Sequence, residues 1–157
     1  ADAVQQGGAT EITIHGRTKA DGYHADRINW EKIGEVRSRL TIPVIANGEI
    51  WRWEDGQACL KATGCEDLMV GRGALNIPNL SLVLKQNCEK MSWTDIQKIL
   101  QKYAEMENFH ASGFYHVARI KQWLRYLNKE YPEADIVFER IKTSKTAEDL
   151  RERLCQC

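Results

Sequence analysis

Two glycine-containing segments carry residue types that bind phosphate groups. Asn47-Gly48-Glu49 follows the apolar run 43–46, and Gly71-Arg72-Gly73 follows the apolar run 68–70. Glycine lets backbone N–H groups approach a ligand closely, and such groups favour an anion. An arginine can hold a phosphate through two parallel hydrogen bonds. These residues therefore predict an anion site built from two loops, with Asn47 and Gly48 in one and Gly71, Arg72 and Gly73 in the other.

A third segment, His15-Gly16-Arg17, ends the β-branched run 11–15. It would bring an imidazole and a guanidinium to the same place as the two glycine loops, provided that all three runs are neighbouring strands. Two plainer interpretations remain open from the residues alone. His15 could be a partly buried histidine with a structural partner, and Arg17 could be an ordinary surface charge.

The elements that must position these loops alternate between strand and helix. The sequence predicts βαβ units with parallel strands, because short apolar runs alternate with helical segments over short joints: strands at 11–15, 42–46 and 67–70, and helices at 30–39 and 53–63. The carboxyl ends of parallel strands meet at one edge of a sheet, where ligands bind. Asn47-Gly48 could instead be a hairpin turn. The helical pattern of "WRWEDGQACLKA" after it favours the βαβ arrangement.

After Pro78 the sequence predicts only helices. Ser92 with Asp95, and Thr146 with Asp149, have the spacing of helix-starting capping boxes. An apolar stripe at helical spacing predicts a helix that ends at Pro132: Val117, Ile120, Leu124 and Leu127. A further helix is predicted at 134–141. The fold class is therefore α/β plus all-α, with an α/β part at 1–84 and a helical bundle at 85–157.

One predicted helix of the bundle carries a row of positive charges without an acidic residue before Glu130: Arg119, Lys121, Arg125 and Lys129. Such a row can neutralise nucleic-acid phosphates. An ordinary solvated helix face is the alternative interpretation. Trp123 and Tyr126 on the same helix could stack on bases or pack inside the bundle, and the sequence does not choose between these.

Composition excludes several classes of protein. The 157 residues carry 22 basic and 22 acidic side chains, so net charge favours no partner. No stretch approaches the roughly 20 apolar residues of a membrane span. The first residues lack the pattern of a signal peptide. They resemble instead the tail of a helix closed by Gly7-Gly8, so we expect the sequence to continue a longer protein. Five scattered cysteines without a C-x-x-C pair indicate reduced thiols in a cytoplasmic protein without a metal site.

Four segments in this order give the sequence a family resemblance: "HGRTKADGY", "PVIANGEIW", "GRGALNIPNL" and "YHVARIKQWL". The chain resembles the tRNA-dihydrouridine synthases, in particular the bacterial subgroup C that modifies uridine 16. The resemblance implies the C-terminal strands and helices of an FMN-binding (β/α)8 TIM barrel, followed by a helical tRNA-binding domain. It implies a flavin enzyme, reduced by NADPH, that converts uridine to 5,6-dihydrouridine in the D-loop of tRNA.

The resemblance also implies roles for individual residues. Those that match the family's FMN contacts are His15, Arg17, Asn47, Gly48, Glu49, Gly71 and Arg72. Those that match its tRNA-binding positions are Tyr23, Arg119, Lys121, Tyr126 and Lys142.

The departures from the family pattern matter as much as the matches. The family's first five strands have no counterpart here, and its catalytic cysteine and flavin-contacting lysine belong to them. No cysteine of this chain lies in a matching motif: Cys59, Cys65, Cys88, Cys155 and Cys157. We therefore expect this chain alone to be inactive. Three parallel strands leave unpaired edges, so self-association is also expected.

Two other functions fit the sequence. The chain could be a non-catalytic RNA-binding or assembly module derived from a truncated flavin barrel. It could also belong to another FMN barrel, such as a dihydroorotate-type dehydrogenase. The helical tail with "ARIKQWL" argues against this last possibility, since such enzymes need no RNA-binding appendage.

Overall fold

The computed structural model describes residues 1–22, 24–106 and 113–155. The chain divides into two compact units. One consists of Ala1–Ala74 with Asn79–Glu89, and we call it the α/β unit. The other consists of Leu75–Pro78 with Lys90–Cys157, and we call it the helical unit.

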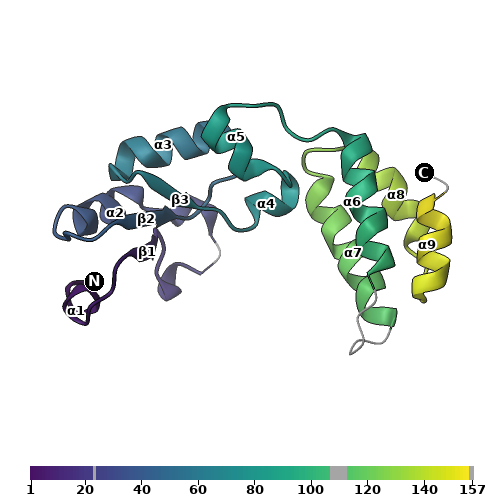
Figure 1. Cartoon of the computed structure of the whole chain (residues 1–157), viewed down its shortest axis with the longest axis horizontal. Coiled ribbons are helices and arrows are strands. Elements are labelled where there is room, and N and C mark those ends of the chain that lie inside the picture. Colours follow the sequence, from purple (N-terminus) through teal and green to yellow (C-terminus); the bar gives the residue numbers. More distant parts are fainter. Residues whose placement is uncertain (23, 107–112, 156–157) are drawn as a thin grey trace. The chain divides into compact units, whose positions relative to one another are not determined.

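The α/β unit is built on a three-stranded parallel sheet in the order β1-β2-β3 (Figure 1). The strands are β1 (Ile12–His15), β2 (Val44–Asn47) and β3 (Asp67–Met69). Helices α2 (Trp30–Arg37) and α3 (Trp53–Thr63) connect them in turn. The predicted βαβ arrangement is thus confirmed. The hairpin alternative at Asn47-Gly48 is wrong, because β2 pairs with both neighbours in parallel.

Helices α2 and α3 cover one face of this sheet. Val44 and Ala46 alternate along β2 with less buried residues, and they pack in a core with Ile33 of α2 and Cys59 of α3. Helix α3 ends at Gly64, whose left-handed backbone (φ 65°) suits glycine. The remaining elements of the unit are short: α1 (Asp2–Gln6), two 3₁₀ turns at Lys19–Asp21 and Ala25–Arg27, and α5 (Leu80–Gln86). Helix α4 (Gly73–Asn76) begins in this unit, and its last two residues are counted with the helical unit.

The helical unit contains α6 (Trp93–Glu105), α7 (Gly113–Leu127), α8 (Glu133–Ile141) and α9 (Ala147–Cys155). Both predicted helix starts are confirmed, since the Ser92 and Thr146 hydroxyls accept hydrogen bonds from the backbone N–H groups of Asp95 and Asp149. The predicted stripe of α7 is fully buried in the core of this unit: Val117, Ile120, Leu124 and Leu127.

Besides shifts of one or two residues at the ends of α2 and α8 and of the strands, two features differ from the predicted elements. Helix α4 was not predicted, because four residues are too few to show a helical period. Helix α7 ends at Leu127, well before Pro132. The backbone N–H groups of Glu130 and Tyr131 both turn back to the Leu127 carbonyl, and this turn buries Tyr131 in the core.

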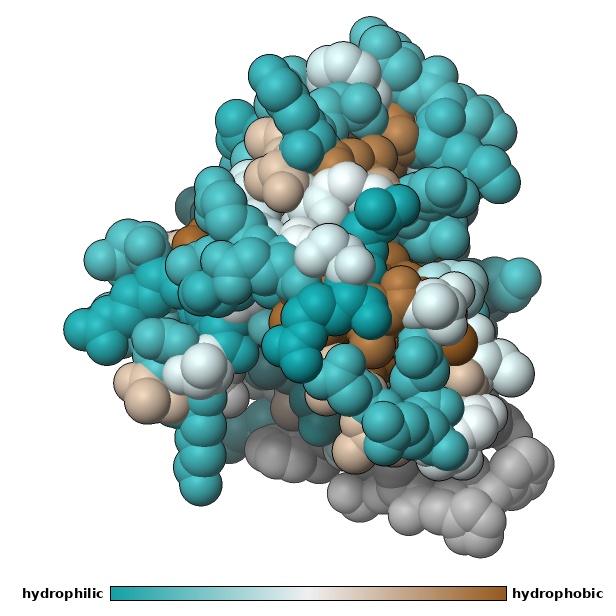
Figure 2. Space-filling model, turned by 90° about the vertical axis from the view of Figure 1, so that its left-hand side faces the viewer, coloured by the Kyte–Doolittle hydropathy of each residue, from teal (hydrophilic) through white to brown (hydrophobic). Residues whose placement is uncertain are grey.

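The face of the molecule shown in Figure 2 is largely hydrophilic. On the face shown in Figure 2, apolar side chains reach the surface only in separate patches between hydrophilic ones. Among the residues that the structure describes, no helix combines the length and the apolar character that a membrane crossing requires.

Candidate functional site

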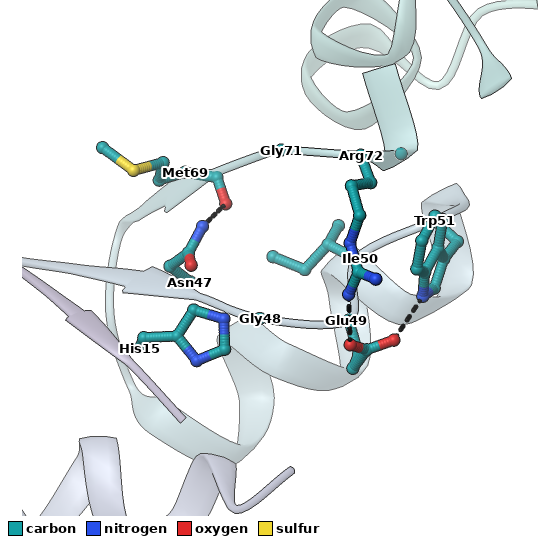
Figure 3. Close-up of a pocket in the computed structure, with 10 residues that line it drawn as sticks. His15, Asn47, Gly48, Glu49, Ile50, Trp51, Met69, Gly71 and Arg72 are labelled. Carbon is teal, nitrogen blue, oxygen red and sulfur yellow. Dashed lines mark hydrogen bonds and ion pairs between the residues drawn. The ribbon is translucent and has the colours of Figure 1, made fainter. Parts of the chain in front are cut away.

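The carboxyl ends of the three strands lie level with one another. His15 pairs in register with Asn47, and Asn47 pairs with Met69. The loops that follow therefore converge on one pocket (Figure 3), which we call the strand-end pocket. It is lined by His15, Asn47, Gly48, Glu49, Ile50, Trp51, Met69, Gly71, Arg72 and Gly73. The three predicted loops are thus brought together.

Side chains fix the loop after β2. The Asn47 side-chain amide donates to the Met69 carbonyl at 2.7 Å, joining the ends of β2 and β3. The Trp30 indole N–H donates to the Gly48 carbonyl at 3.0 Å. Gly48 has φ 129°, and a β-carbon there would collide with the Ile28 side chain. Only glycine fits this turn.

Glu49, whose side chain is 8% exposed, is the centre of a charged cluster. Its Oε1 forms an ion pair with Arg17 Nη2 at 2.8 Å and accepts a hydrogen bond from Arg72 Nη2 at 3.0 Å. Its Oε2 accepts from the Trp51 indole N–H at 2.8 Å. We call these four residues the Glu49 cluster. The cluster thus brings two guanidinium groups to one carboxylate at the edge of the pocket.

The two arginines of the cluster differ in exposure. The Arg17 side chain is 5% exposed, and its Nη1 also donates to the His24 carbonyl. The interpretation of Arg17 as a surface charge is therefore wrong. The Arg72 side chain is 42% exposed and lies over the Trp51 ring, 5.2 Å from its centre. Arg17 is buried inside the cluster, whereas Arg72 presents its charge to the pocket.

His15 has a defined protonation state at the pocket. The Arg17 backbone N–H donates to His15 Nδ1 at 3.1 Å, so the neutral ring carries its proton on Nε2. Desolvation lowers the pKa of His15, and the positive charges of Arg17 and Arg72 lower it further against the opposing effect of Glu49. The imidazole is therefore a neutral N–H donor at neutral pH.

The loop after β3 has free space beside Gly71, whereas the loop after β2 is closely packed at Gly48. A β-carbon at Gly71 would meet nothing within 4 Å. Among the described residues, no protein acceptor binds the backbone N–H groups of Gly71 and Gly73. At Gly73, in contrast, a β-carbon would collide with the Ile50 carbonyl oxygen, so the two loops meet backbone to backbone. The N–H groups and the Arg72 guanidinium give the pocket a donor set that suits an anion.

The predicted tRNA-binding residues have different surroundings in the helical unit. Arg119 is exposed, and its guanidinium lies over the Tyr115 ring. The Lys121 ammonium donates to the carbonyls of Lys142 and Ser144, at 2.8 Å and 2.7 Å, beyond the end of α8. Lys142 is exposed and paired with Glu139. Tyr126 is half-buried, and Tyr23 lies outside the described residues.

Sequence reasoning missed the two tryptophans that support the strand-end pocket. Trp30 and Trp51 each use the indole N–H to hold a group of the Asn47–Glu49 loop. A tryptophan near a glycine loop is a usable signal, because its large apolar ring carries one polar hydrogen that needs an acceptor when buried.

Comparison with known proteins identifies the family. The dihydrouridine synthase (Dus) family model matches residues 1–156. Over 98% of its length the chain is 79% identical to the tRNA-dihydrouridine(16) synthase of Haemophilus influenzae and 67% identical to that of Pasteurella multocida. Over 96% of its length it is 55% identical to the same enzyme of Escherichia coli K12. These matches cover 50%, 49% and 48% of the relatives, so the chain spans about half their length. The chain belongs to the dihydrouridine synthase family.

Proposed function

We propose that this chain supplies the FMN-phosphate site and the RNA-docking helices of a tRNA-dihydrouridine synthase that acts on uridine 16. The proposal includes the fold that the family resemblance implies. Residues 1–84 would form the C-terminal part of a (β/α)8 barrel, and residues 85–157 a helical tRNA-binding domain. The observation that carries the proposal is the strand-end pocket, where the Arg72 guanidinium and the backbone N–H groups of Gly71 and Gly73 give the chemistry of a phosphate site.

The residues of the pocket fit a phosphate group. Arg72 is held by Glu49 on one side and by the Trp51 ring on another, so its charge has a fixed position. The backbone N–H groups of Gly71 and Gly73 lie beside it, and the space above Gly71 is open. Arg72 and Gly71 would hold the FMN phosphate, and the guanidinium charge of Arg72 would attract it.

The other matched residues would hold the rest of the cofactor. His15 offers a neutral Nε2–H donor. The side-chain nitrogen of Asn47 donates to the Met69 carbonyl at the end of β3, so the side-chain oxygen of Asn47 stays available to the cofactor. Gly48 keeps the loop close to the sheet. Glu49 and Arg17 would act by placing Arg72. When bound, FMN reduced by NADPH would supply the hydride that saturates the uracil ring.

The helical unit would bind tRNA through α7. Between Gly113 and Leu127 this helix carries three basic side chains and no acidic one. Arg119 and Arg125 are exposed and face solvent beside aromatic rings. They could neutralise tRNA phosphates, with Lys142 as a further contact. Lys121 would act indirectly, since it fixes the turn after α8 on which Lys142 lies.

The described cysteines do not suit a general acid at the strand-end pocket. Cys59 is completely buried in the core under the sheet, and Cys65 is 7% exposed. None of the residues that line the pocket is a cysteine. The proposal therefore assigns the catalytic cysteine to no residue of this chain and expects no uridine reduction from the purified chain alone.

FMN binding separates this proposal from the non-catalytic RNA-binding or assembly module. The chain is titrated with FMN and with riboflavin, which lacks the phosphate, and flavin fluorescence is followed. The proposal expects saturable FMN binding at least about tenfold tighter than riboflavin binding, since one charge-assisted phosphate contact contributes about that factor. Equal affinities, or no binding of either flavin, would contradict the phosphate site and favour the non-catalytic module.

A further inference from the structure

The helical unit contains a second cavity, which is separate from the Glu49 cluster. It is a hollow of about 460 Å³ between α6 and α7, and we call it the aromatic hollow. Its lining residues are Leu75, Tyr103, Arg119, Gln122, Trp123 and Tyr126. Three aromatic rings and one leucine give it apolar walls, and one guanidinium and one amide lie among them.

The geometry of the rings favours a flat ligand. Trp123 and Tyr103 meet edge to face, with ring centres 6.4 Å apart and planes at 79°. The Trp123 indole N–H donates to the Leu75 carbonyl at 3.1 Å, which holds the indole in one orientation. Its polar hydrogen is thus used, so the ring offers the hollow an apolar face. A planar aromatic group could stack there without leaving a buried donor unpaired.

Each polar side chain that lines the hollow can donate a hydrogen bond. The Gln122 side-chain oxygen already accepts from Arg119 Nη1 at 2.8 Å, so the groups that these two residues can still offer a ligand are N–H donors. No acidic side chain lines the hollow within the described residues. The ligand should therefore carry carbonyl or phosphate acceptors on or next to its planar group.

The surrounding charge identifies the ligand class. Helix α7 runs along the hollow with Arg119, Lys121 and Arg125 and without an acidic side chain. A planar ring with carbonyl acceptors, linked to a chain of negative charges, is a nucleobase in RNA. An apolar peptide would bury the aromatic walls but would gain nothing from these cations.

We propose that the aromatic hollow is a stacking site for one unpaired nucleobase of an RNA. The proposal rests on the proposed function in one respect, namely that tRNA is the partner of this helix. It makes Tyr103, Trp123 and Tyr126 the ring surfaces, and it adds Gln122 as a donor to the edge of the base. Bases that are not paired can be splayed onto aromatic side chains in this way.

The test compares two short single-stranded RNAs with the intact chain. One carries 2-aminopurine, a fluorescent base whose emission falls on stacking, and the other has an abasic site at the same position. The wild-type chain should quench the 2-aminopurine and bind that RNA about tenfold more tightly than the abasic one, as expected for one stacked base. Equal affinities and unquenched fluorescence would overturn the proposal.

Matched variants separate stacking from charge. Tyr126→Leu keeps an apolar side chain but removes the ring, so it should abolish the preference for the base-containing RNA. Tyr126→Phe keeps the ring and should restore that preference. Arg125→Gln lies on the same helix outside the hollow, and it should weaken binding of both RNAs equally. Loss of the base preference in Arg125→Gln as well would overturn the assignment to the hollow.

A parallel titration with tRNA distinguishes the failure of this proposal from that of the proposed function. Binding of tRNA without any base preference in the short RNAs overturns only the stacking site. Base-dependent binding of the short RNA without binding of tRNA supports the hollow and contradicts the proposed tRNA partner. A hydrophobic dye that occupies the hollow and is not displaced by RNA would point to an apolar partner and overturn the proposal.

Discussion

The α/β unit and the helical unit place their charged side chains differently. In the α/β unit, Arg17 and Glu49 are almost completely buried at the edge of the pocket that they support. In the helical unit, Arg119 and Arg125 lie on the surface over a core of aliphatic and aromatic side chains. Binding and stability should therefore depend on the same residues in the first unit and on different residues in the second.

The physical reason is the effect of burial on charge. A buried ion pair that loses one partner leaves an uncompensated charge in a poorly polarisable environment, which is strongly unfavourable. An exposed guanidinium remains hydrated whether or not it has a partner, so its loss changes stability little. Mutations that remove charges can therefore test the contrast directly.

The largest effect is expected from Glu49→Ala, which leaves Arg17 buried without its carboxylate. The free energy of unfolding of the α/β unit should fall by about 3–5 kcal/mol. Urea titrations followed by tryptophan fluorescence and by far-UV circular dichroism would measure this. The matched control is Glu66→Ala, an exposed acidic residue of the same unit, which should change the free energy by less than about 0.5 kcal/mol. Equal effects of the two variants would contradict a buried cluster.

A comparable loss of stability in the helical unit should come from an apolar residue. Leu124→Ala removes a fully buried side chain of α7 and should cost about 2–5 kcal/mol. The ratio of FMN to riboflavin affinity should stay unchanged, because the strand-end pocket belongs to the other unit. Ile136→Ala, at a position that is 63% exposed, is the control and should be nearly neutral in the same urea titration. A change in the flavin ratio of Leu124→Ala would show that the two units are not independent.

Arg72→Gln should affect binding without much effect on stability. The side chain is 42% exposed, so the free energy of unfolding should change by no more than about 1 kcal/mol. The FMN affinity should fall about ten- to hundredfold, and the riboflavin affinity should not change, because only FMN carries the phosphate. Arg27→Gln removes an exposed charge of the same unit and controls for the long-range effect of charge. If the affinities for FMN and for riboflavin fell by the same factor, Arg72 would not be a phosphate contact.

The smallest effect concerns alkaline pH. Burial raises the pKa of the Cys59 thiol from 9.0 to about 11. Between these values the unfolded chain loses the thiol proton and the folded chain keeps it, so stability falls as pH rises, by about 1 kcal/mol at pH 10. Burial likewise raises the pKa of Tyr131 in the helical unit from 10.0 to about 12, so that unit should lose stability at higher pH.

Urea titrations at pH 8 and pH 10 would measure the alkaline effect. The variant Cys59→Val fills a similar volume without an ionisable group and should flatten the pH dependence of the α/β unit. An unchanged dependence in this variant would assign the alkaline loss to another group.

The two units also differ in how far their sequence predicted their structure. The bounds of α3 are those predicted, because the helix is long enough to show its period and Gly64 ends it clearly. The convergence of the three loops followed from parallel strands. The ion pairs of Glu49 could not be predicted from the sequence, because several basic side chains could have been its neighbours before the order of the strands was known.

In the helical unit the sequence predicted the buried stripe but not the use of each charge. Lys121 belongs to the predicted row of positive charges, yet its ammonium binds the carbonyls of Lys142 and Ser144. Helical spacing shows which side chains share a face. It does not show which neighbouring helix ends against that face. The hydrogen bonds of Lys121 to the turn after α8 could therefore not be predicted from the sequence.

The close approach at Gly73 has a consequence for the dynamics of the strand-end pocket. Because the backbone at Gly73 meets the Ile50 carbonyl without a side chain between them, neither loop can shift far without displacing the other. The Asn47 amide ties the same two loops at the strand ends. The spacing of the donors in the pocket is then set before any ligand arrives. An anion that binds there should lose its own freedom of motion but should impose little new order on the protein.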